Sequence, residues 1–254
     1  MLLVVDIGNT NIVFGLFEGD QIKSHWRISS DKSRTSDEYG VLFKKLIDIK
    51  EIDTKQIKGA AISCVVPTLL ETILEAINTY FEVEPIIVGP GVKTGMPILY
   101  HNPKEVGADR IVNGVGAFER YHESVIVVDF GTATTFDCIS EKGEYLGGVI
   151  TTGLHVSAEA LYQKASKLPR VEFIKPDNVI GKTTVESIQS GLVHGYAGLV
   201  DGIVKKIKSE MNTEPRVIAT GGSAELIAKE SESIESVDNF LTLKGLKLIY
   251  ERNQ

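Results

Sequence analysis

Apolar residues occur along the chain in two alternating patterns, short β-branched runs and stripes at helical spacing. The runs predict strands, which in the first part of the chain lie at about residues 2–5, 12–17, 21–28, 59–66 and 85–88. The stripes predict helices, one from Thr35 or Ser36 to Ile49 and one from Pro67 to Phe81. In the first of these helices the expected buried stripe consists of Val41, Leu42, Leu46 and Ile49.

The second part of the chain repeats this plan. Strands are predicted at about residues 125–128, 134–139, 145–150 and 216–219. Helices are predicted after residue 107, up to Ala165, from Val185 to Met211, from Ser223 and from Leu241 to Tyr250. Three strands followed by helix, strand, helix and strand is the ribonuclease-H-like order. We therefore expect an α/β protein of two such halves, residues 1–115 and 116–254.

Both halves begin with the same strand and turn. Residues 3–17 read Leu-Val-Val-Asp-Ile-Gly-Asn-Thr-Asn-Ile-Val-Phe-Gly-Leu-Phe, and residues 125–137 read Val-Ile-Val-Val-Asp-Phe-Gly-Thr-Ala-Thr-Thr-Phe-Asp. A carboxylate at a strand end can hold a cation, while the N–H groups and hydroxyls of the turn face an anion. Two such turns predict two phosphate cradles with one polyphosphate in the cleft between the halves. The alternative is that Asp and Gly only form turns here.

Charge, the first apolar run and the cysteines indicate which binding partners and which cellular compartment to expect. The net charge is −7 and the pI is about 5.4, with no basic cluster, which argues against a nucleic-acid partner. Asp6 interrupts the first apolar run too early for a signal peptide or a membrane helix. Cys64 and Cys138 lie in apolar runs and are expected to be free thiols. We expect a cytoplasmic protein that does not bind membranes.

Three further stretches suggest chemistry or assembly. Asp109 opens a helix, where it is either a first-turn acid favoured by the helix dipole or a general base, whereas Arg110 opposes that dipole. The Gly221-Gly222 turn could let a base or ribose approach the backbone, or could be an ordinary strand-to-helix turn. The long helix carries one face of glycines, at positions 191, 195, 198 and 202, which predicts close contact with another helix of this chain or of a second subunit.

Six motifs, in their order along nearly the whole chain, resemble those of the type III pantothenate kinases. They are Asp-Ile-Gly-Asn-Thr-Asn at 6–11, Asn-Pro-Lys-Glu-Val at 102–106, Gly-Ala-Asp-Arg at 107–110, Asp-Phe-Gly-Thr-Ala at 129–133, Ala-Thr-Gly-Gly at 219–222 and Leu-Thr-Leu-Lys-Gly-Leu at 241–246. Single motifs of this kind are shared across the actin, Hsp70 and sugar-kinase fold, but their combination is specific. The chain departs from the family pattern at Thr152, where Pro is usual, and at Thr183, where Asn is common.

The resemblance implies ATP-dependent phosphorylation of the primary hydroxyl of pantothenate to 4'-phosphopantothenate, the first step of coenzyme A biosynthesis. It also implies a homodimer that requires K⁺ or NH₄⁺, with Asp129 as the ligand of this monovalent cation. ATP contacts are implied for Asp6, Ile7, Gly8, Asn9, Thr10, Asn11, Ile12, Val13, Thr132, Gly221 and Gly222. Pantothenate contacts are implied for Tyr100, Gly107, Ala108, Arg110 and Thr184, with Asp109 as the base.

The residues themselves favour the same chemistry. Asp6 is expected to hold Mg²⁺ directly or through water, and Arg110 could bind a substrate carboxylate with two hydrogen bonds. Neither cradle, 6–13 or 129–137, contains a Lys or Arg, so a further cation beside Mg²⁺ is expected to balance the triphosphate. Two alternatives are another small-molecule kinase of the same fold and a non-enzymatic accessory regulator of transcription.

Overall fold

The computed structural model describes residues 1–254, which form two compact units. The first unit contains Met1–Met96, Tyr100–Gly116 and Leu241–Gln254, and the second contains Pro97–Leu99 and Ala117–Phe240. The last segment of the chain therefore belongs to the first unit, whereas the sequence placed it in the second half. None of the helices combines the length and the apolar character that a membrane crossing requires.

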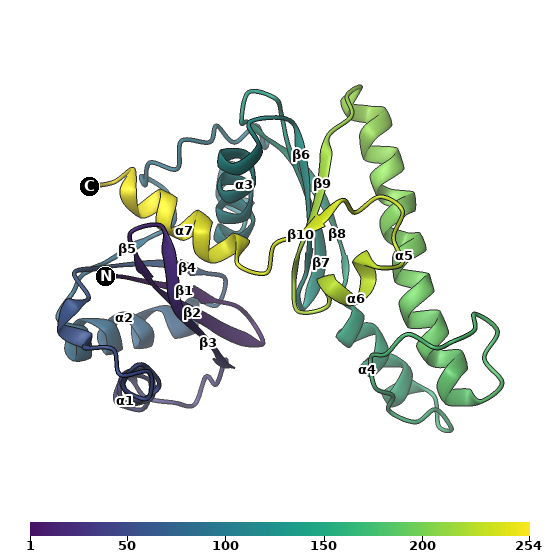
Figure 1. Cartoon of the computed structure of the whole chain (residues 1–254), viewed down its shortest axis with the longest axis horizontal. Coiled ribbons are helices and arrows are strands. Elements are labelled where there is room, and N and C mark those ends of the chain that lie inside the picture. Colours follow the sequence, from purple (N-terminus) through teal and green to yellow (C-terminus); the bar gives the residue numbers. More distant parts are fainter. The chain divides into compact units, whose positions relative to one another are not determined.

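The first unit is built on a five-stranded sheet in the order β3-β2-β1-β4-β5 (Figure 1). Its strands are β1 (Leu2–Ile7), β2 (Asn11–Glu18), β3 (Gln21–Ser29), β4 (Gly59–Cys64) and β5 (Pro85–Ile87). The first three strands form an antiparallel meander, and β4 and β5 run parallel to β1. This is the ribonuclease-H-like order that the sequence predicted.

Helices α1 (Ser36–Asp48) and α2 (Pro67–Phe81) share one apolar cluster with the first sheet. Of the two cap residues that the sequence left open, Thr35 is the one that caps α1, and it forms a capping box with Glu38. The predicted apolar stripe of α1 is wrong at Val41 and Ile49, which are 55% and 63% exposed, whereas Leu46 is partly buried against the cluster. The buried face consists of Tyr39, Phe43 and Ile47, which follow one another at intervals of four residues.

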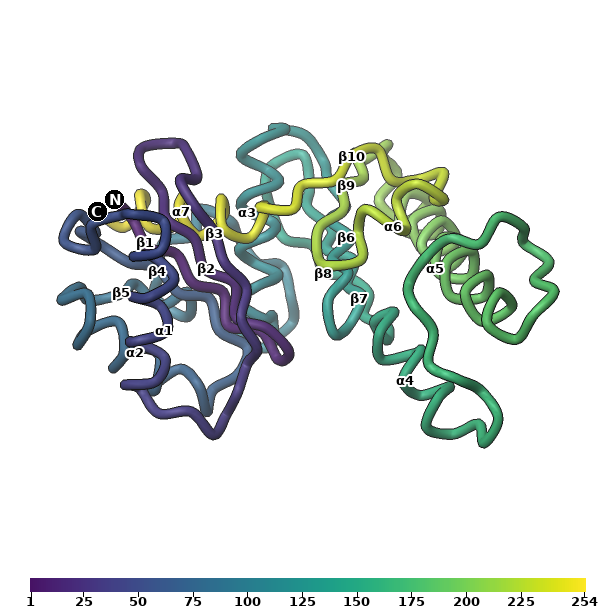
Figure 2. The backbone as a smooth tube through the Cα atoms, turned by 60° about the horizontal axis from the view of Figure 1, so that its bottom comes forward, coloured from purple at the N-terminus to yellow at the C-terminus, as the bar shows by residue number.

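Helix α7 (Leu241–Glu251) packs on the first sheet at two of its glycines. A β-carbon on Gly59 would lie 2.5 Å from Cζ of Tyr250, and one on Gly15 would lie 3.0 Å from Cδ1 of Leu243. Figure 2 shows this last helix, in yellow, returning beside the purple strands of the N-terminal segment. These contacts explain why the tail of the sequence completes the first unit.

Helix α3 (Ala108–Tyr121) begins in the first unit and is in close contact there with α7. A β-carbon on Gly245 would lie 2.1 Å from the carbonyl oxygen of Val112, and one on Gly116 would lie 2.9 Å from that of Leu241. The hydroxyl of Thr242 also donates to Oδ1 of Asn113 at 2.7 Å. Glycine at these two positions allows the two helix backbones to touch. Two short 3₁₀ turns, η1 (Thr54–Gln56) and η2 (Pro103–Glu105), complete the unit.

The second unit repeats the architecture of the first. Its strands are β6 (Val125–Phe130), β7 (Ala133–Ile139), β8 (Tyr145–Thr152), β9 (Arg216–Gly221) and β10 (Ser236–Val237), in the order β8-β7-β6-β9-β10 (Figure 1). Strand directions match those of the first sheet at every pairing. Only the short strand β10 has no counterpart among the predicted elements. Helices α4 (Leu154–Lys164), α5 (Thr184–Met211) and α6 (Ala224–Ala228) contribute to an apolar cluster with this sheet.

The glycine face of α5 is open within the chain. A β-carbon on Gly191, Gly195, Gly198 or Gly202 would meet no atom within 4 Å. The opposite face of α5 is buried in the core of the second unit, through residues such as Leu192, Val200 and Val204. The expected close partner of the glycine face is therefore not another helix of this chain.

Candidate functional site

The first acid of the site, Asp6, is directed away from the apolar cluster by the alternation of side chains along β1. Val5 and Ile7 enter the cluster with α1 and α2, so Asp6 between them points to the opposite face of the sheet. The parallel register of β1 and β4 places Ser63 directly beside Asp6. The hydroxyl of Ser63, which is fully buried, donates a hydrogen bond to Oδ1 of Asp6.

Asp109 lies in the first turn of α3, in the same unit as Asp6. Its Oδ1 accepts a hydrogen bond from the backbone N–H of Arg110 at 2.8 Å. A β-carbon on Gly107 would come within 2.5 Å of this oxygen and 3.6 Å of Cγ1 of Val65. Asp109 is therefore a first-turn acid, and its carboxylate is also folded back over a glycine that leaves room for it.

Both acids are in surroundings that favour their protonated form. The pKa of Asp6 is raised to about 7, chiefly by burial and also by the carboxylate of Asp109, while the Ser63 hydroxyl and the Arg27 guanidinium lower it. Burial also raises the pKa of Asp109, while the backbone N–H and the charge of Arg110 oppose this rise. Acids with raised pKa values are suited to accepting protons and to binding cations.

The predicted first cradle, residues 6–13, is the end of β1, a tight turn and the start of β2. The N–H of Gly8 donates to the carbonyl oxygen of Asn11 at 3.0 Å, which closes the turn. Ser30 fixes it from outside, because its hydroxyl donates to the Gly8 carbonyl at 2.6 Å and its N–H donates to the Thr10 carbonyl at 3.0 Å. Asn9 and Thr10 at the tip remain exposed, where a phosphate could reach them.

The predicted second cradle has the same construction in the second unit. The N–H of Gly131 donates to the carbonyl oxygen of Ala133 at 3.0 Å, and the N–H of Gly153 donates to that of Thr132 at 3.1 Å. A β-carbon on Gly153 would lie 2.3 Å from the Gly131 carbonyl oxygen, so this position requires glycine. Thr132 is exposed at the tip of the turn.

Gly221 lies next to the carboxylate of Asp129. Gly221 has a φ of +93°, and a β-carbon there would lie 2.5 Å from Oδ1 of Asp129. The parallel register of β6 and β9 also pairs Asp129 with Thr220, which is 3% exposed. Gly222 follows as an exposed turn residue before α6. The turn predicted near the adenosine therefore adjoins the acid predicted to hold a monovalent cation.

The residues predicted to contact pantothenate occupy three different places. Ala108 and the buried Arg110 flank Asp109 in the first turn of α3, while Tyr100 lies half-buried in the segment before η2. Thr184 begins α5 in the second unit, where it is exposed and lines a hollow of about 630 Å³. Thr183 caps this helix, since its hydroxyl accepts from the N–H of Glu186 at 3.1 Å. None of the other predicted site residues lines that hollow.

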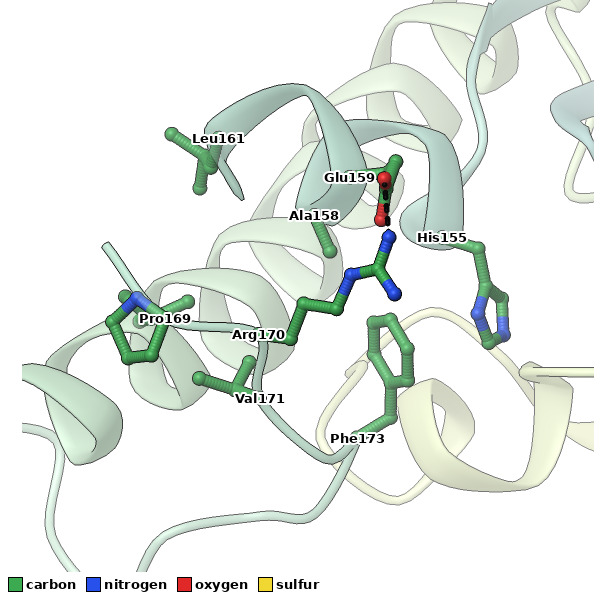
Figure 3. A pocket seen from close by; sticks show the side chains of 9 residues that line it. His155, Ala158, Glu159, Leu161, Pro169, Arg170, Val171 and Phe173 are labelled. Atoms are coloured by element: carbon green, nitrogen blue, oxygen red, sulfur yellow. Dashed lines mark hydrogen bonds and ion pairs between the residues drawn. The ribbon is translucent and has the colours of Figure 1, made fainter. Parts of the chain in front are cut away.

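A second hollow of about 340 Å³ lies between α4 and the segment that follows it (Figure 3). Arg170 points to Glu159, with 2.9 Å between Nη2 of the arginine and Oε1 of the glutamate. The ring centroids of His155 and Phe173 lie 4.1 Å apart. Thr152 precedes α4, and its carbonyl oxygen accepts from the hydroxyl of Tyr196 at 3.0 Å. The position where the family usually has proline is therefore tied to α5.

The acids fit a metal ion in the manner expected of Mg²⁺ bound with a nucleotide. No group of three or more His, Cys, Asp or Glu residues gathers at one place, so the protein offers no complete cage. Mg²⁺ is commonly held by one or two carboxylates, with water and phosphate oxygens as its other ligands. Asp6 suits this role because a cation would offset the cost of its buried charge.

Ser63 was not identified from the sequence as part of the site. A signal was present, since the repeat between the halves continues into the fourth strand of each sheet. There Ser63 pairs with Asp6, and Thr220 pairs with Asp129. The two hydroxyl residues therefore occupy equivalent places in the two units.

Comparisons with known proteins agree with this construction. Residues 2–206 match the family described as type III pantothenate kinase. A protein of Myxococcus xanthus (strain DK1622) named type III pantothenate kinase is 56% identical over 253 residues, which cover 100% of this chain and 99% of that protein. A type III pantothenate kinase of Geobacter sulfurreducens (strain ATCC 51573 / DSM 12127 / PCA) is 55% identical, with full coverage of both chains.

Solved structures confirm the fold class. A ROK family glucokinase from Streptomyces griseus, in complex with glucose and AMPPNP, has a TM-score of 0.54 and 12% identity, and 98% of each chain is covered. At this level of identity the similarity concerns the fold alone. The chain has the two-part α/β fold of the actin, Hsp70 and sugar-kinase group.

Proposed function

Because this chain belongs to the type III pantothenate kinase family, we propose that it transfers the γ-phosphoryl group of ATP to the primary hydroxyl of pantothenate. The product is 4'-phosphopantothenate, and the reaction is the first step of coenzyme A biosynthesis. The observation that carries the proposal at the level of the site is the proximity of two half-buried acids, Asp6 and Asp109, in the first unit.

Asp109 acts as the general base in this proposal. Its pKa is raised by burial, so its carboxylate accepts a proton more readily than an exposed aspartate. It takes the proton of the pantothenate hydroxyl as the oxygen forms its bond to phosphorus. The N–H of Arg110 holds one carboxylate oxygen at 2.8 Å, which leaves the other for the hydroxyl.

The two turns bind the phosphates of ATP. Phosphoryl transfer depends mainly on positioning and on neutralising charge, and the exposed turn residues around Asn9 and Thr132 are placed to supply N–H and hydroxyl donors. Asp6 holds Mg²⁺ directly or through water, and the ion supplies charge neutralisation on the phosphate oxygens. Gly221 and Gly222 receive the adenosine, since their turn carries no side chains that would block a flat ring.

Pantothenate is held by Tyr100, by residues 107–110 and by Thr184. The guanidinium of Arg110 is suited to binding the carboxylate of pantothenate with two hydrogen bonds. Thr184 is on the second unit, at the exposed start of α5. Its assignment to the acceptor site comes from the resemblance to the family.

Two further properties belong to the proposal. Asp129 and nearby oxygens bind K⁺ or NH₄⁺, because the cradles carry no Lys or Arg to balance the triphosphate. The chain forms a homodimer, which the open glycine face of α5 supports. A cytoplasmic location is consistent with the two cysteines, which are free in the structure.

The test is an acceptor panel assayed with Mg-ATP and KCl. Pantothenate, glucose, N-acetylglucosamine and glycerol are offered singly, ADP release is measured, and the product is identified by mass spectrometry. We expect rapid turnover with pantothenate and a product that carries one phosphate on the primary hydroxyl. Turnover with a sugar but not with pantothenate would identify another kinase of the fold. Absence of turnover with every acceptor, together with ATP binding, would favour the accessory regulator.

A further inference from the structure

Ser63 is a buried polar side chain that belongs to none of the assigned motifs. It is 0% exposed, near the end of β4, and its hydroxyl donates to Oδ1 of Asp6. Placing a hydroxyl in the core of a protein costs free energy unless it makes a hydrogen bond. Ser63 makes that bond with the one acid expected to hold the nucleotide's metal ion.

We propose that Ser63 is a positioning residue that sets the orientation of the Asp6 carboxylate. This inference rests on the proposed function, in which Asp6 holds Mg²⁺. The hydrogen bond fixes Oδ1 toward β4, and the second oxygen, Oδ2, is left for a cation. Groups that hydrogen-bond to metal-binding carboxylates commonly change metal affinity or activity by about 10–100-fold when they are removed.

The segment that carries Ser63 also lies near the second acid of the unit. Ser63 binds Asp6, and two residues later a methyl carbon of Val65 lies 3.6 Å from the position that a β-carbon on Gly107 would take, where the carboxylate of Asp109 folds back. The carboxylate of Asp109 also raises the pKa of Asp6, which agrees with a short distance between the two acids.

The second unit repeats the arrangement independently. Thr220 on β9 is the register partner of Asp129 on β6, as Ser63 on β4 is the register partner of Asp6 on β1. Both hydroxyl residues are buried, at 0% and 3% exposure. A hydroxyl residue beside each cradle acid is thus part of the repeated construction, which supports a role in the site.

The experiment compares Ser63→Ala and Ser63→Thr with the wild type. Thr keeps the hydroxyl, and its β-branched side chain is favourable in a strand. Binding of Mn²⁺ in the presence of ADP is measured by electron paramagnetic resonance, and kcat and KM are measured over a range of Mg²⁺ concentrations. We expect Ser63→Ala to weaken Mn²⁺ binding about tenfold and to raise the Mg²⁺ concentration for half-maximal rate similarly, with little change in the KM for pantothenate. Ser63→Thr should restore most of the affinity.

A matched control is Ser231→Ala. Ser231 donates to Oδ1 of Asp201 at 2.6 Å in the second unit, so the variant loses a Ser–Asp hydrogen bond that involves no acid of the site. It should keep wild-type Mn²⁺ binding. If Ser63→Ala also keeps it, the inference is wrong and Ser63 only fills space. If the wild type binds Mn²⁺ with ADP but does not phosphorylate pantothenate, the proposed function fails while the role of Ser63 is still tested by Mn²⁺ binding.

Discussion

A β-carbon on Gly107 would lie 2.5 Å from Oδ1 of Asp109, so the carboxylate occupies space that only glycine leaves open. The resemblance to the family implies that Gly107 contacts the substrate. The carboxylate of Asp109 gives a second reason for a glycine at this position. We expect Gly107→Ala to displace the carboxylate and to lower kcat about 100-fold, since small misplacements of a catalytic group can cost this much. Steady-state kinetics checks the rate, and ATP binding by calorimetry should be unchanged. A near wild-type kcat in Gly107→Ala would show that the carboxylate of Asp109 can shift without loss of catalytic rate.

Asp109→Asn tests the base directly. The amide keeps the size of the side chain but cannot accept the proton, so kcat should fall about 10²–10⁴-fold. Binding of ATP and the unfolding temperature should change little. A rapid-quench measurement of phosphopantothenate formed in a single turnover separates the chemical step from product release. Wild-type turnover would leave Asp109 as an ordinary acid of the first helical turn.

The pKa of Asp6 predicts how the stability of the metal-free protein depends on pH. The ordinary pKa is 3.8 and the folded value is about 7, so the folded chain binds a proton that the unfolded chain has released between these values. This stabilisation is fully present below about pH 4 and is lost as the pH rises to 7. Asp6→Asn cannot ionise, so it should flatten this dependence and stabilise the protein at pH 8 by about 1–2 kcal/mol.

Thermal unfolding followed by circular dichroism at pH 4 to 8 measures this effect. The difference between Asp6→Asn and wild type should grow with pH. If the unfolding temperatures of the variant and the wild type differed by the same amount at every pH, burial would not perturb the pKa of Asp6. Adding Mg-ATP should reverse the order of stability, because the wild type then gains a ligand that the variant binds poorly.

The absence of basic residues in both cradles predicts dependence on a monovalent cation. Residues 6–13 and 129–137 contain no Lys or Arg, while Asp6 and Asp129 add negative charge beside the phosphates. With Mg-ATP in a sodium or Tris buffer we expect little activity, and KCl or NH₄Cl should restore it at constant ionic strength. Asp129→Ala should lose this response. Equal rates with and without potassium would refute the prediction, and a potassium response retained by Asp129→Ala would place the ion elsewhere.

The open face of α5 predicts an effect on assembly rather than on folding. A side chain at Gly195 would meet nothing within 4 Å in its own chain, so Gly195→Leu should leave the fold intact. If a second copy packs on this face, the added side chain overfills the contact and should raise the dimer dissociation constant at least tenfold. Sedimentation velocity over a range of concentrations measures this constant. A fully dimeric variant would show that the glycine face is turned to solvent.

The sequence predicted the parts of the fold that local patterns and the repeat determine. The strand order of both sheets follows from the repeated run of strands and turns, and this placed Asp6 and Asp129 at equivalent strand ends. The buried face of α1 could not be read correctly, because an apolar residue at Val41 competes with the true series through Phe43. Only the packing of α1 on α2 and the sheet decides between them.

Contacts between distant segments were the least predictable. The sequence predicted a helix contact at the four regularly spaced glycines on α5, but a β-carbon at any of them would meet no atom of the chain within 4 Å. The glycines at which two helices do touch are Gly116 and Gly245. Gly116 is one of two glycines in α3 and Gly245 is the only glycine in α7, so no regular spacing marks them as a contact. Ser63 is marked only by the repeat, because its position beside Asp6 depends on the register of β4 beside β1.

Because α7 packs on the first sheet, the first unit cannot complete its fold until the end of the chain has been synthesised. During translation, the strands from β1 to β5 emerge first, but Gly15 and Gly59 receive Leu243 and Tyr250 only after residues 117–240 have also been synthesised. Until then, one face of the nascent sheet lacks its cover, and exposed apolar surface on incomplete chains favours aggregation. A gene fragment that stops at residue 116 would encode a first unit without its final helix. Expressing residues 1–116 together with 241–254, joined by a short linker, is the appropriate way to obtain that unit alone.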